Sequence, residues 1–235
     1  MDERLLALRT EIEAIGPLVE TSLNIEQGAP PYLVLQPEDM DALLDGAEDD
    51  PEQNLPYWAE LWPSGIALAR AIAREPQMLR GEQVLEIGSG LGVTAAAALR
   101  AGADLIVADY SRESLLLCRY NCLRIAEREP ETIQLNWRQP SDDFLALVGD
   151  GVPIVLAADV LYESRDVAPL LHFMEQIVAP GGLLWLAEPG RPPAARFLTA
   201  ADEAGWSRAS TTADGPWPDP KDAAVVVGLH RMWRR

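Results

Sequence analysis

The sequence predicts an α/β protein with a doubly wound, mostly parallel sheet that carries helices on both faces. Short apolar runs alternate with helical stretches from residue 83 to residue 204, and such alternation is typical of a parallel sheet. A glycine-rich turn joins the first strand of this series to its helix, and an acidic residue ends the second strand. A strand, a glycine turn and a helix in succession place a ligand against helix N-terminal amides.

The chain before this series carries elements of its own. Apolar residues at helical spacing predict a helix over 3–15, and residues 32–35 read as a short strand. A helix from Pro37 to Leu44 follows, and we expect Ser64 to cap a helix over 65–74. We therefore divide the chain into an acidic N-terminal α/β extension, residues 1–55, and a main domain, residues 56–235.

The elements of the main domain are expected in strict alternation. The predicted ranges are strand 83–87, helix 91–101, strand 105–109, helix 112–127, strand 132–136, helix 141–148, strand 153–158, helix 166–178, strand 182–188 and helix 192–204. A proline-rich loop at 215–220 leads into a last strand over 223–229. Ligands of such sheets bind at the carboxyl ends of the strands.

Composition limits the class of protein. Hydrophobic residues make up 48% of the 235 residues, yet no apolar run reaches the ~18 residues of a membrane span. The start, Met1 to Arg4, lacks the basic region of a signal peptide. Cys118 and Cys122 lie four positions apart without a nearby histidine, which favours packing over a disulfide or a metal site. We expect a soluble, cytoplasmic protein without structural metal.

The net charge of −18 is unevenly distributed. Residues 1–60 contain 15 acidic residues against only Arg4 and Arg9, a net charge of −13. Such a surface repels a phosphate backbone, so nucleic acid is not the expected partner. It would attract a cationic amine or a basic protein surface. For the acidic cluster at 48–52, a plain solvated loop is an equally open interpretation.

The glycine turn has an unusual spacing. Glu86 ends the first strand, and Gly88, Gly90 and Gly92 follow at alternate positions. The dinucleotide fingerprint G-x-G-x-x-G needs its third glycine where this chain has Val93. An acidic residue two positions before G-x-G-x-G resembles motif I of the S-adenosylmethionine-dependent methyltransferases. In that family the turn wraps the methionine part of the cofactor.

Asp109 ends the second strand, 23 positions after Glu86. A carboxylate at this point reads the ribose hydroxyl pair in nucleotide-binding βαβ units, because it accepts two hydrogen bonds at once. A turn or helix-cap role is the alternative, since Ser111 opens the next helical stretch.

Two further segments should reach the same edge of the sheet. Trp137 follows the third strand, where an indole could stack on adenine or fill the core. Glu188 ends the fifth strand and could reach a substrate channel, although turn chemistry explains it equally well.

Two motifs make the resemblance specific. Asp159-Val160-Leu161-Tyr162 matches the D-x-x-Y motif of the family 16 protein methyltransferases, mostly lysine methyltransferases of the seven-β-strand class. The segment from Tyr57 to Gly65, YWAELWPSG, is similar to the aromatic-W-x-x-x-W-P-G-G segment of one branch. That branch includes the lysine methyltransferases of electron-transfer flavoprotein β-subunit. The resemblance covers about residues 56–190, and Ser64 departs from the branch pattern.

The resemblance implies a Rossmann-like, seven-stranded methyltransferase domain over residues 56–235, with S-adenosylmethionine as cofactor. Glu86 and the glycines would hold its methionine end, and Asp109 its ribose. Asp159 and Tyr162 would be the catalytic residues and line the channel of the target amine. The residues that the resemblance implies for the cofactor are Trp62, Ser64, Glu86, Gly88, Ser89, Gly90, Asp109, Tyr110, Trp137 and Asp159.

The resemblance further implies an enzyme that methylates lysine side chains of a partner protein. We expect it to be a monomer, with neither nucleic acid nor membrane as partner. Such an enzyme has mainly to orient a neutral amine and exclude water, because the cofactor carries its own leaving group. Two alternatives stay open. One is N-methylation of a small amine or heterocycle, and the other is an inactive binding or scaffold protein with a methyltransferase fold.

Overall fold

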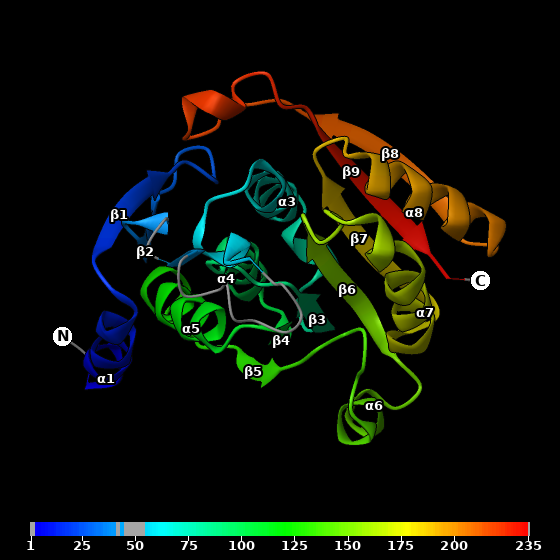
Figure 1. Cartoon of the computed structure of the whole chain (residues 1–235), viewed down its shortest axis with the longest axis horizontal. Coiled ribbons are helices and arrows are strands. Elements are labelled where there is room, and N and C mark those ends of the chain that lie inside the picture. The colour runs from blue at the N-terminus through cyan, green and yellow to red at the C-terminus, as the bar shows by residue number, and fades with distance from the viewer. Residues whose placement is uncertain (1–2, 41–42, 45–54, 235) are drawn as a thin grey trace.

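A seven-stranded sheet forms the centre of the molecule, in a computed structural model that describes residues 3–40, 43–44 and 55–234. Its strand order is β5-β4-β3-β6-β7-β9-β8. The strands are β3 (Gln83–Ile87), β4 (Asp104–Asp109), β5 (Glu131–Gln134), β6 (Val152–Ala158), β7 (Val178–Glu188), β8 (Ser207–Ala213) and β9 (Val227–Trp233). Strands β3 to β7 run parallel, and β9 is antiparallel to β7 and β8. The expected mostly parallel sheet is confirmed (Figure 1).

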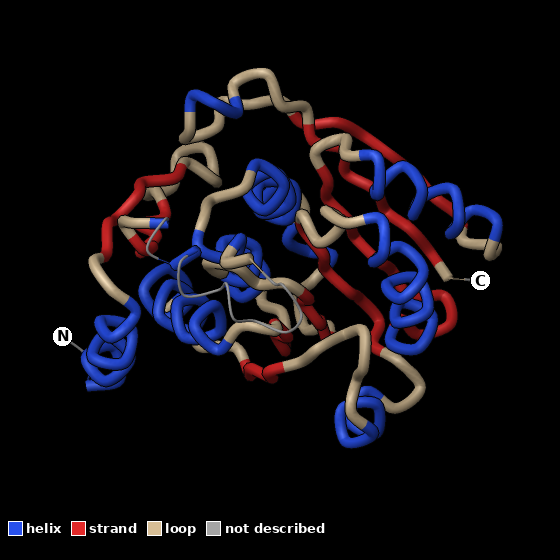
Figure 2. Tube along the Cα trace, viewed as in Figure 1, coloured by secondary structure: helices blue, strands red, loops and turns tan. Residues whose placement is uncertain are grey.

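Helices cover both faces of this sheet (Figure 2). The helices of one face are α3 (Pro63–Arg74), α4 (Val93–Ala101) and α5 (Arg112–Ala126), and those of the other are α6 (Asp142–Val148), α7 (Val167–Ile177) and α8 (Pro192–Glu203). Successive strand residues point to opposite faces, so Val84 joins the first core and Leu85 the second. Because both faces are buried, the central strands are mostly apolar, with the buried Glu86 of β3 as an exception.

The N-terminal segment packs on the first face. Helix α1 (Glu3–Ile12) lies against α5, and β1 (Leu18–Leu23) pairs antiparallel with β2 (Tyr32–Pro37) (Figure 1). Buried Asn121 of α5 donates to the carbonyls of Leu35 and Leu91, both at 2.9 Å, and accepts from Leu35 N–H at 2.8 Å. This amide joins β2 to the chain beside the glycine turn. The division of the chain at residue 55 stays a prediction.

Two edge strands and two strand starts differ from the expectations, and one of these starts is that of β7, which begins at Val178 rather than at residue 182. Strands β1 and β8 were not predicted, because Glu20, Thr21 and Ser22 interrupt the first and β8, with the sequence SRASTTA, is almost wholly polar. The last strand begins at Val227 rather than at residue 223. Pairing with β7 and β8 decides this boundary, since Gly228 lies opposite Glu188 and Val227 lies opposite Ala213.

Two predicted helix starts are wrong. Ser64 does not cap α3, because Pro63 occupies the first helical position and Trp62 becomes the N-cap residue. Pro37 ends β2 instead of starting a helix. Residues 43–44 are helical, while residues 41–42 and 45–54 lie outside the described part of the chain.

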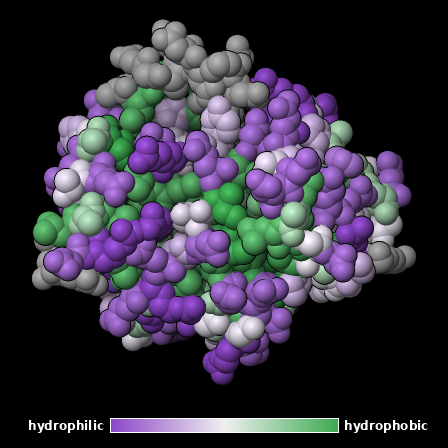
Figure 3. All heavy atoms as spheres, turned by 90° about the horizontal axis from the view of Figure 1, so that it is seen from below, coloured by the Kyte–Doolittle hydropathy of each residue, from purple (hydrophilic) through white to green (hydrophobic). Residues whose placement is uncertain are grey.

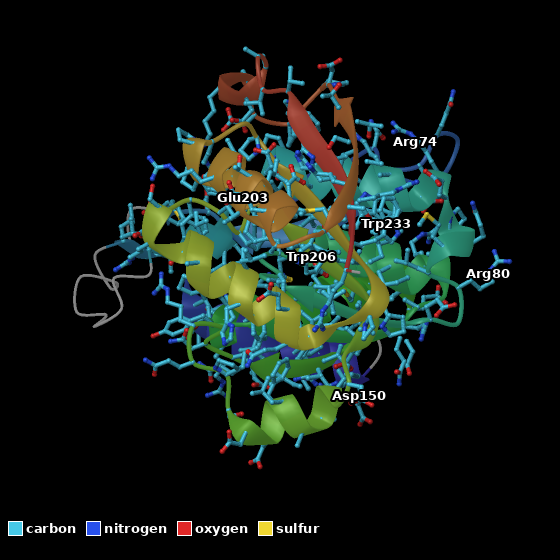
Figure 4. The ribbon with its side chains drawn as sticks, turned by 90° about the vertical axis from the view of Figure 1, so that its right-hand side faces the viewer. Arg74, Arg80, Asp150, Glu203, Trp206 and Trp233 are labelled. Atoms are coloured by element: carbon cyan, nitrogen blue, oxygen red, sulfur yellow. The ribbon has the colours of Figure 1, made fainter. Side chains whose placement is uncertain are left out.

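One face of the molecule shows how polar and apolar residues share the surface (Figure 3). Seen from below, hydrophilic residues cover most of the face and apolar patches lie between them (Figure 3). On the side of α7 and α8, Trp206 follows α8 and is 5% exposed (Figure 4). None of the helices that the structure describes combines the length and the apolar character of a membrane span.

Candidate active site

The site lies where the sheet changes its direction of winding, between β3 and β6. From β3 the chain moves outward to β4 and β5, and from β6 it moves the other way to β7. Gly88 N–H, just after β3, donates to Ala108 O at 2.9 Å, and Asp159 N–H, just after β6, donates to Ala187 O at 2.9 Å. The glycine turn and the D-x-x-Y motif therefore leave adjacent strands at the edge where such sheets bind ligands.

Three cavities, of about 250, 110 and 50 Å³, open along this edge, and Trp62 lines all of them. Glu86 and Ser89 line the smallest. The intermediate cavity brings together most of the other predicted residues, namely Trp62, Gly88, Gly90, Asp109, Tyr110, Trp137, Asp159 and Tyr162. Ser64 is the one predicted residue that lines none of these three cavities. A larger cavity of about 450 Å³, between β2 and residues 218–221, contains none of the predicted residues.

The glycines of the turn serve two purposes. A Cβ on Gly88, at φ +69°, would lie 2.8 Å from Val160 Cγ1, so the glycine lets the turn approach the D-x-x-Y segment. A Cβ on Gly92, at φ +79°, would lie 2.8 Å from Cys118 Cα on α5. Gly92 therefore allows the turn to pack closely on α5. This role does not depend on the binding of a dinucleotide or on the glycine spacing of the dinucleotide fingerprint.

Glu86 is a buried carboxylate, only 1% exposed. Its Oε2 atom has no hydrogen-bond partner among the described residues. Burial, and then the nearby Cys118 and Asp109, raise the pKa of Glu86 well above its usual value. An unpartnered buried carboxylate is costly unless it meets a donor. The amino group of a methionine moiety would supply a charged donor, so Glu86 fits the cofactor that the motifs imply.

Asp109 ties the glycine turn to the start of α5. Its Oδ2 accepts from Ser89 Oγ at 3.2 Å, Gly90 N–H at 3.3 Å and Ser114 Oγ at 2.8 Å. Its Oδ1 accepts from Ser111 N–H at 2.9 Å, and Ser111 itself caps α5. The alternative turn role is thus real, and the predicted ribose role would use the remaining capacity of Oδ1. Burial raises the pKa of Asp109, and these hydrogen bonds oppose the shift.

Aromatic side chains form one wall of the largest of the three cavities. The ring centroids of Tyr57 and Tyr162 lie 5.2 Å apart, and those of Tyr57 and Trp62 lie 6.2 Å apart, both edge to face. Trp62 Nε1 donates to Tyr57 O at 2.7 Å, which fixes the indole. Burial, and then nearby carboxylates, raise the pKa of Tyr162 to about 12. Its hydroxyl is therefore neutral and can donate a hydrogen bond.

Asp159 lies beside this wall in an unusual backbone conformation, with φ +58°. Ser64 Oγ donates to its Oδ2 at 3.2 Å, and Arg191 donates to its Oδ1. Burial raises the pKa of Asp159, while Arg191 opposes the shift. Ser64 is fully buried and orients Asp159, and its predicted contact with the cofactor stays a prediction.

Arg191 and Ser114 are the site residues that sequence reasoning missed. The turn from Glu188 to Arg191 was recognised, but only its glutamate was considered for a role. Glu188 instead accepts Gly190 N–H at 2.6 Å and contacts His230 Nε2 at 3.1 Å, so it shapes the turn that carries Arg191. No local pattern marks an arginine 32 positions from its carboxylate.

The arrangement separates two chemical tasks. Glu86 lines the smallest cavity and Asp109 and Trp137 line the intermediate one, and the glycine turn lines both. Together the two cavities form a cleft that would suit an amino acid joined to a nucleoside, as S-adenosylmethionine is. Asp159 and the aromatic wall adjoin that cleft and suit a cation, because a carboxylate and aromatic faces both attract positive charge. An amine placed there would meet a methyl donor held by the first group.

Solved structures agree on the fold. The chain resembles the N-methyltransferase NodS from Bradyrhizobium japonicum in complex with S-adenosylhomocysteine, with a TM-score of 0.58 and 17% identity over 83% of this chain and 97% of that one. It also resembles magnesium protoporphyrin IX methyltransferase from Synechocystis, with a TM-score of 0.55 and 14% identity over 84% and 98% of the two chains. At such identities the likeness shows the Rossmann-like fold alone.

Sequence relatives are more specific. The electron transfer flavoprotein beta subunit lysine methyltransferase of Rattus norvegicus is 35% identical over 144 residues, which cover 58% of this chain and 52% of the relative. The histone-arginine methyltransferase METTL23 of Mus musculus is 31% identical over 117 residues, 49% of this chain and 46% of the relative. The chain thus spans about half the length of these relatives. The lysine methyltransferase family model matches residues 51–202, well over half of the sequence, and the chain therefore belongs to the lysine methyltransferase family.

Proposed function

We propose that this protein transfers a methyl group from S-adenosylmethionine to lysine side chains of another protein. The observation that carries the proposal is Asp159, a carboxylate with a 6% exposed side chain, next to the predicted cofactor cleft and against aromatic rings. Membership of the lysine methyltransferase family supports it. The names of the relatives point to protein substrates as well.

The residues of the site would act on the amine in a fixed order. A lysine arrives as ammonium, with a reference pKa of ~10.4, and binds Asp159 by charge. Its proton then passes to Asp159, whose pKa burial raises, and the neutral nitrogen gains a free electron pair. Asp159 releases this proton to solvent once the methyl group has been transferred. S-adenosylmethionine, when bound, supplies a methyl group on a sulfonium that leaves without further activation. Tyr57, Trp62 and Tyr162 exclude water and hold the methylated cation, at ~0.5–2 kcal/mol for each good ring contact.

The partner is proposed as a protein that presents a lysine on a basic surface, because the chain carries a net charge of −18. Such charge accelerates association with a basic partner at low salt. The monomeric state and the cytoplasmic location stay predictions, which light scattering and cell fractionation would test.

The test is transfer of labelled methyl groups from S-adenosylmethionine into a lysate of the source organism, followed by mass spectrometry of the labelled residue. We expect methyl-lysine in one or a few proteins with the unaltered chain and with Arg196→Gln, whose arginine bonds Ser164 outside the site. Asp159→Asn should give no label. Label in methyl-arginine or only in small amines would reject the lysine proposal, and failure to bind S-adenosylmethionine would favour the scaffold alternative.

A further inference from the structure

The acceptor cavity already contains a cation from this chain. The cavity of about 250 Å³ beside Asp159 is lined by five residues, Tyr57, Trp62, Asp159, Tyr162 and Arg191. Three of these are aromatic, one is an acid and one is a base. Aromatic faces with a carboxylate are the groups that bind an alkylammonium or methylammonium ion.

Arg191 makes both contacts that a target ammonium would make. Its guanidinium forms an ion pair with Asp159 Oδ1, and its Cζ lies 5.4 Å from the centroid of Trp62. The side chain of Arg191 is 30% exposed, against 6% for that of Asp159. The arginine therefore covers the acid from the solvent side, where a substrate must enter.

The backbone beneath Arg191 is held in place. Glu188 accepts Gly190 N–H at 2.6 Å and contacts His230 Nε2 at 3.1 Å. Gly190 has φ +83°, and Arg191 follows as the N-cap residue of α8 without a side-chain cap bond. Displacement of the guanidinium then requires rotation of a long side chain and no movement of the turn.

We propose that Arg191 is a resident counter-ion that occupies the target-amine position, and that the substrate ammonium must displace it from Asp159. The proposal rests on the function proposed above. Pairing with Arg191 keeps the buried acid compensated between turnovers, because an unpaired buried charge is costly. Only a cation replaces the arginine without leaving Asp159 unpaired, so neutral amines are rejected. After transfer, the returning guanidinium competes with the methylated product and promotes its release.

The test measures binding of n-butylammonium chloride to the protein saturated with S-adenosylhomocysteine, by calorimetric titration. The titration is made at about pH 8, where an alkylammonium stays protonated. Arg191→Gln and Arg191→Met should each bind the probe about tenfold more tightly than the unaltered protein, which is 1.4 kcal/mol. Arg191→Lys, which restores a cation, and the surface control Arg196→Gln should stay within about twofold of it.

Two results would overturn the proposal. Weaker or unchanged probe binding in both neutral variants, with an unchanged melting temperature, would make Arg191 a wall of the cavity rather than a competitor. A large loss of S-adenosylhomocysteine affinity in these variants would make it a cofactor ligand. If one neutral variant does not fold, the other neutral variant decides by the same titration.

The same variants separate this inference from the proposed function. Probe binding does not depend on the identity of the acceptor, whereas label transfer into protein lysine does. Tighter probe binding without any methyl-lysine in the lysate would retain the counter-ion and reject the lysine substrate. Methyl-lysine with unchanged probe binding would do the reverse.

Discussion

The two halves of the site treat their buried carboxylates in opposite ways. On the β3 and β4 side, Asp109 is held by hydroxyl and amide groups, and Glu86 Oε2 has no partner in the described part of the chain. On the β6 and β7 side, Asp159 is paired with a cationic side chain. Burial raises the pKa of all three acids. In the first half, hydrogen bonds hold Asp109 in place, and Glu86 Oε2 can still accept a hydrogen bond. In the second half, Asp159 is paired with Arg191, which we propose a substrate cation displaces.

The largest expected effect comes from removing the charge of Asp159, on the β6 and β7 side of the site. Asp159→Asn keeps the shape of the side chain but removes its charge and its basicity. We expect kcat to fall by about 100-fold to 10,000-fold, while the affinity for S-adenosylhomocysteine changes by less than about threefold, as measured by calorimetry. Equal losses of turnover and cofactor affinity would move Asp159 into the cofactor half.

The next effect concerns protein stability and the packing of the glycine turn on α5. Gly92→Ala places a Cβ 2.8 Å from Cys118 Cα at φ +79°, whereas Gly81→Ala has a similar φ of +77° and open space. Strain alone costs ~1–2 kcal/mol, and overpacking adds ~1–3 kcal/mol. Chemical denaturation should therefore show a clearly larger loss of unfolding free energy for Gly92→Ala. Equal losses for the two variants would mean that α5 yields to the methyl group.

A third prediction links stability and binding at Glu86. The folded chain holds the Glu86 proton more tightly than the unfolded chain, so the stability of the ligand-free protein falls as the pH rises above the usual value of 4.5 and towards the raised pKa. Glu86→Gln removes this cost. At a pH above the raised pKa of Glu86, we expect the variant to have a melting temperature about 2–4 °C higher than that of the unaltered protein.

Below pH 4.5 the Glu86→Gln difference should vanish, because Glu86 is then protonated in both states. The same variant should bind S-adenosylmethionine about tenfold to 100-fold more weakly, since a charge-assisted hydrogen bond is lost. A variant that is more stable yet binds the cofactor normally would place the methionine amino group elsewhere.

The smallest expected effect tests the predicted contact between Trp137 and the adenine of the cofactor. Trp137 lines the intermediate cavity and stacks with Arg138, whose Cζ lies 5.6 Å from the ring centroid. Trp137→Ala should weaken binding of S-adenosylhomocysteine about threefold to tenfold, the value of one lost aromatic contact. Trp137→Phe should recover most of this affinity. Failure of both variants to change the affinity would leave Trp137 as a packing residue.

Local chemistry explains which elements could be predicted. The strand before Gly88 is apolar apart from Gln83 and Glu86, and Ser111 was correctly placed at the start of α5, whereas the cap role had been considered for Asp109 and is taken by Ser111. Strand β8 could not be recognised, because an edge strand with a polar sequence is ordered only by its pairing with β9. Ser64 shows the opposite error, since Pro63 satisfies the start of α3 and leaves the serine free to bond Asp159.

By itself, the sequence determined the fold class and the glycine turn, since apolar periodicity and glycine conformation act over a few neighbouring residues. The D-x-x-Y motif was recognised through the family resemblance. The tertiary structure alone decided which distant groups meet. Arg191 reaches Asp159 because β7 lies beside β6, and Asn121 joins β2 to the glycine turn because α5 packs against both. Such contacts depend on the order of strands in the sheet, which no local pattern specifies.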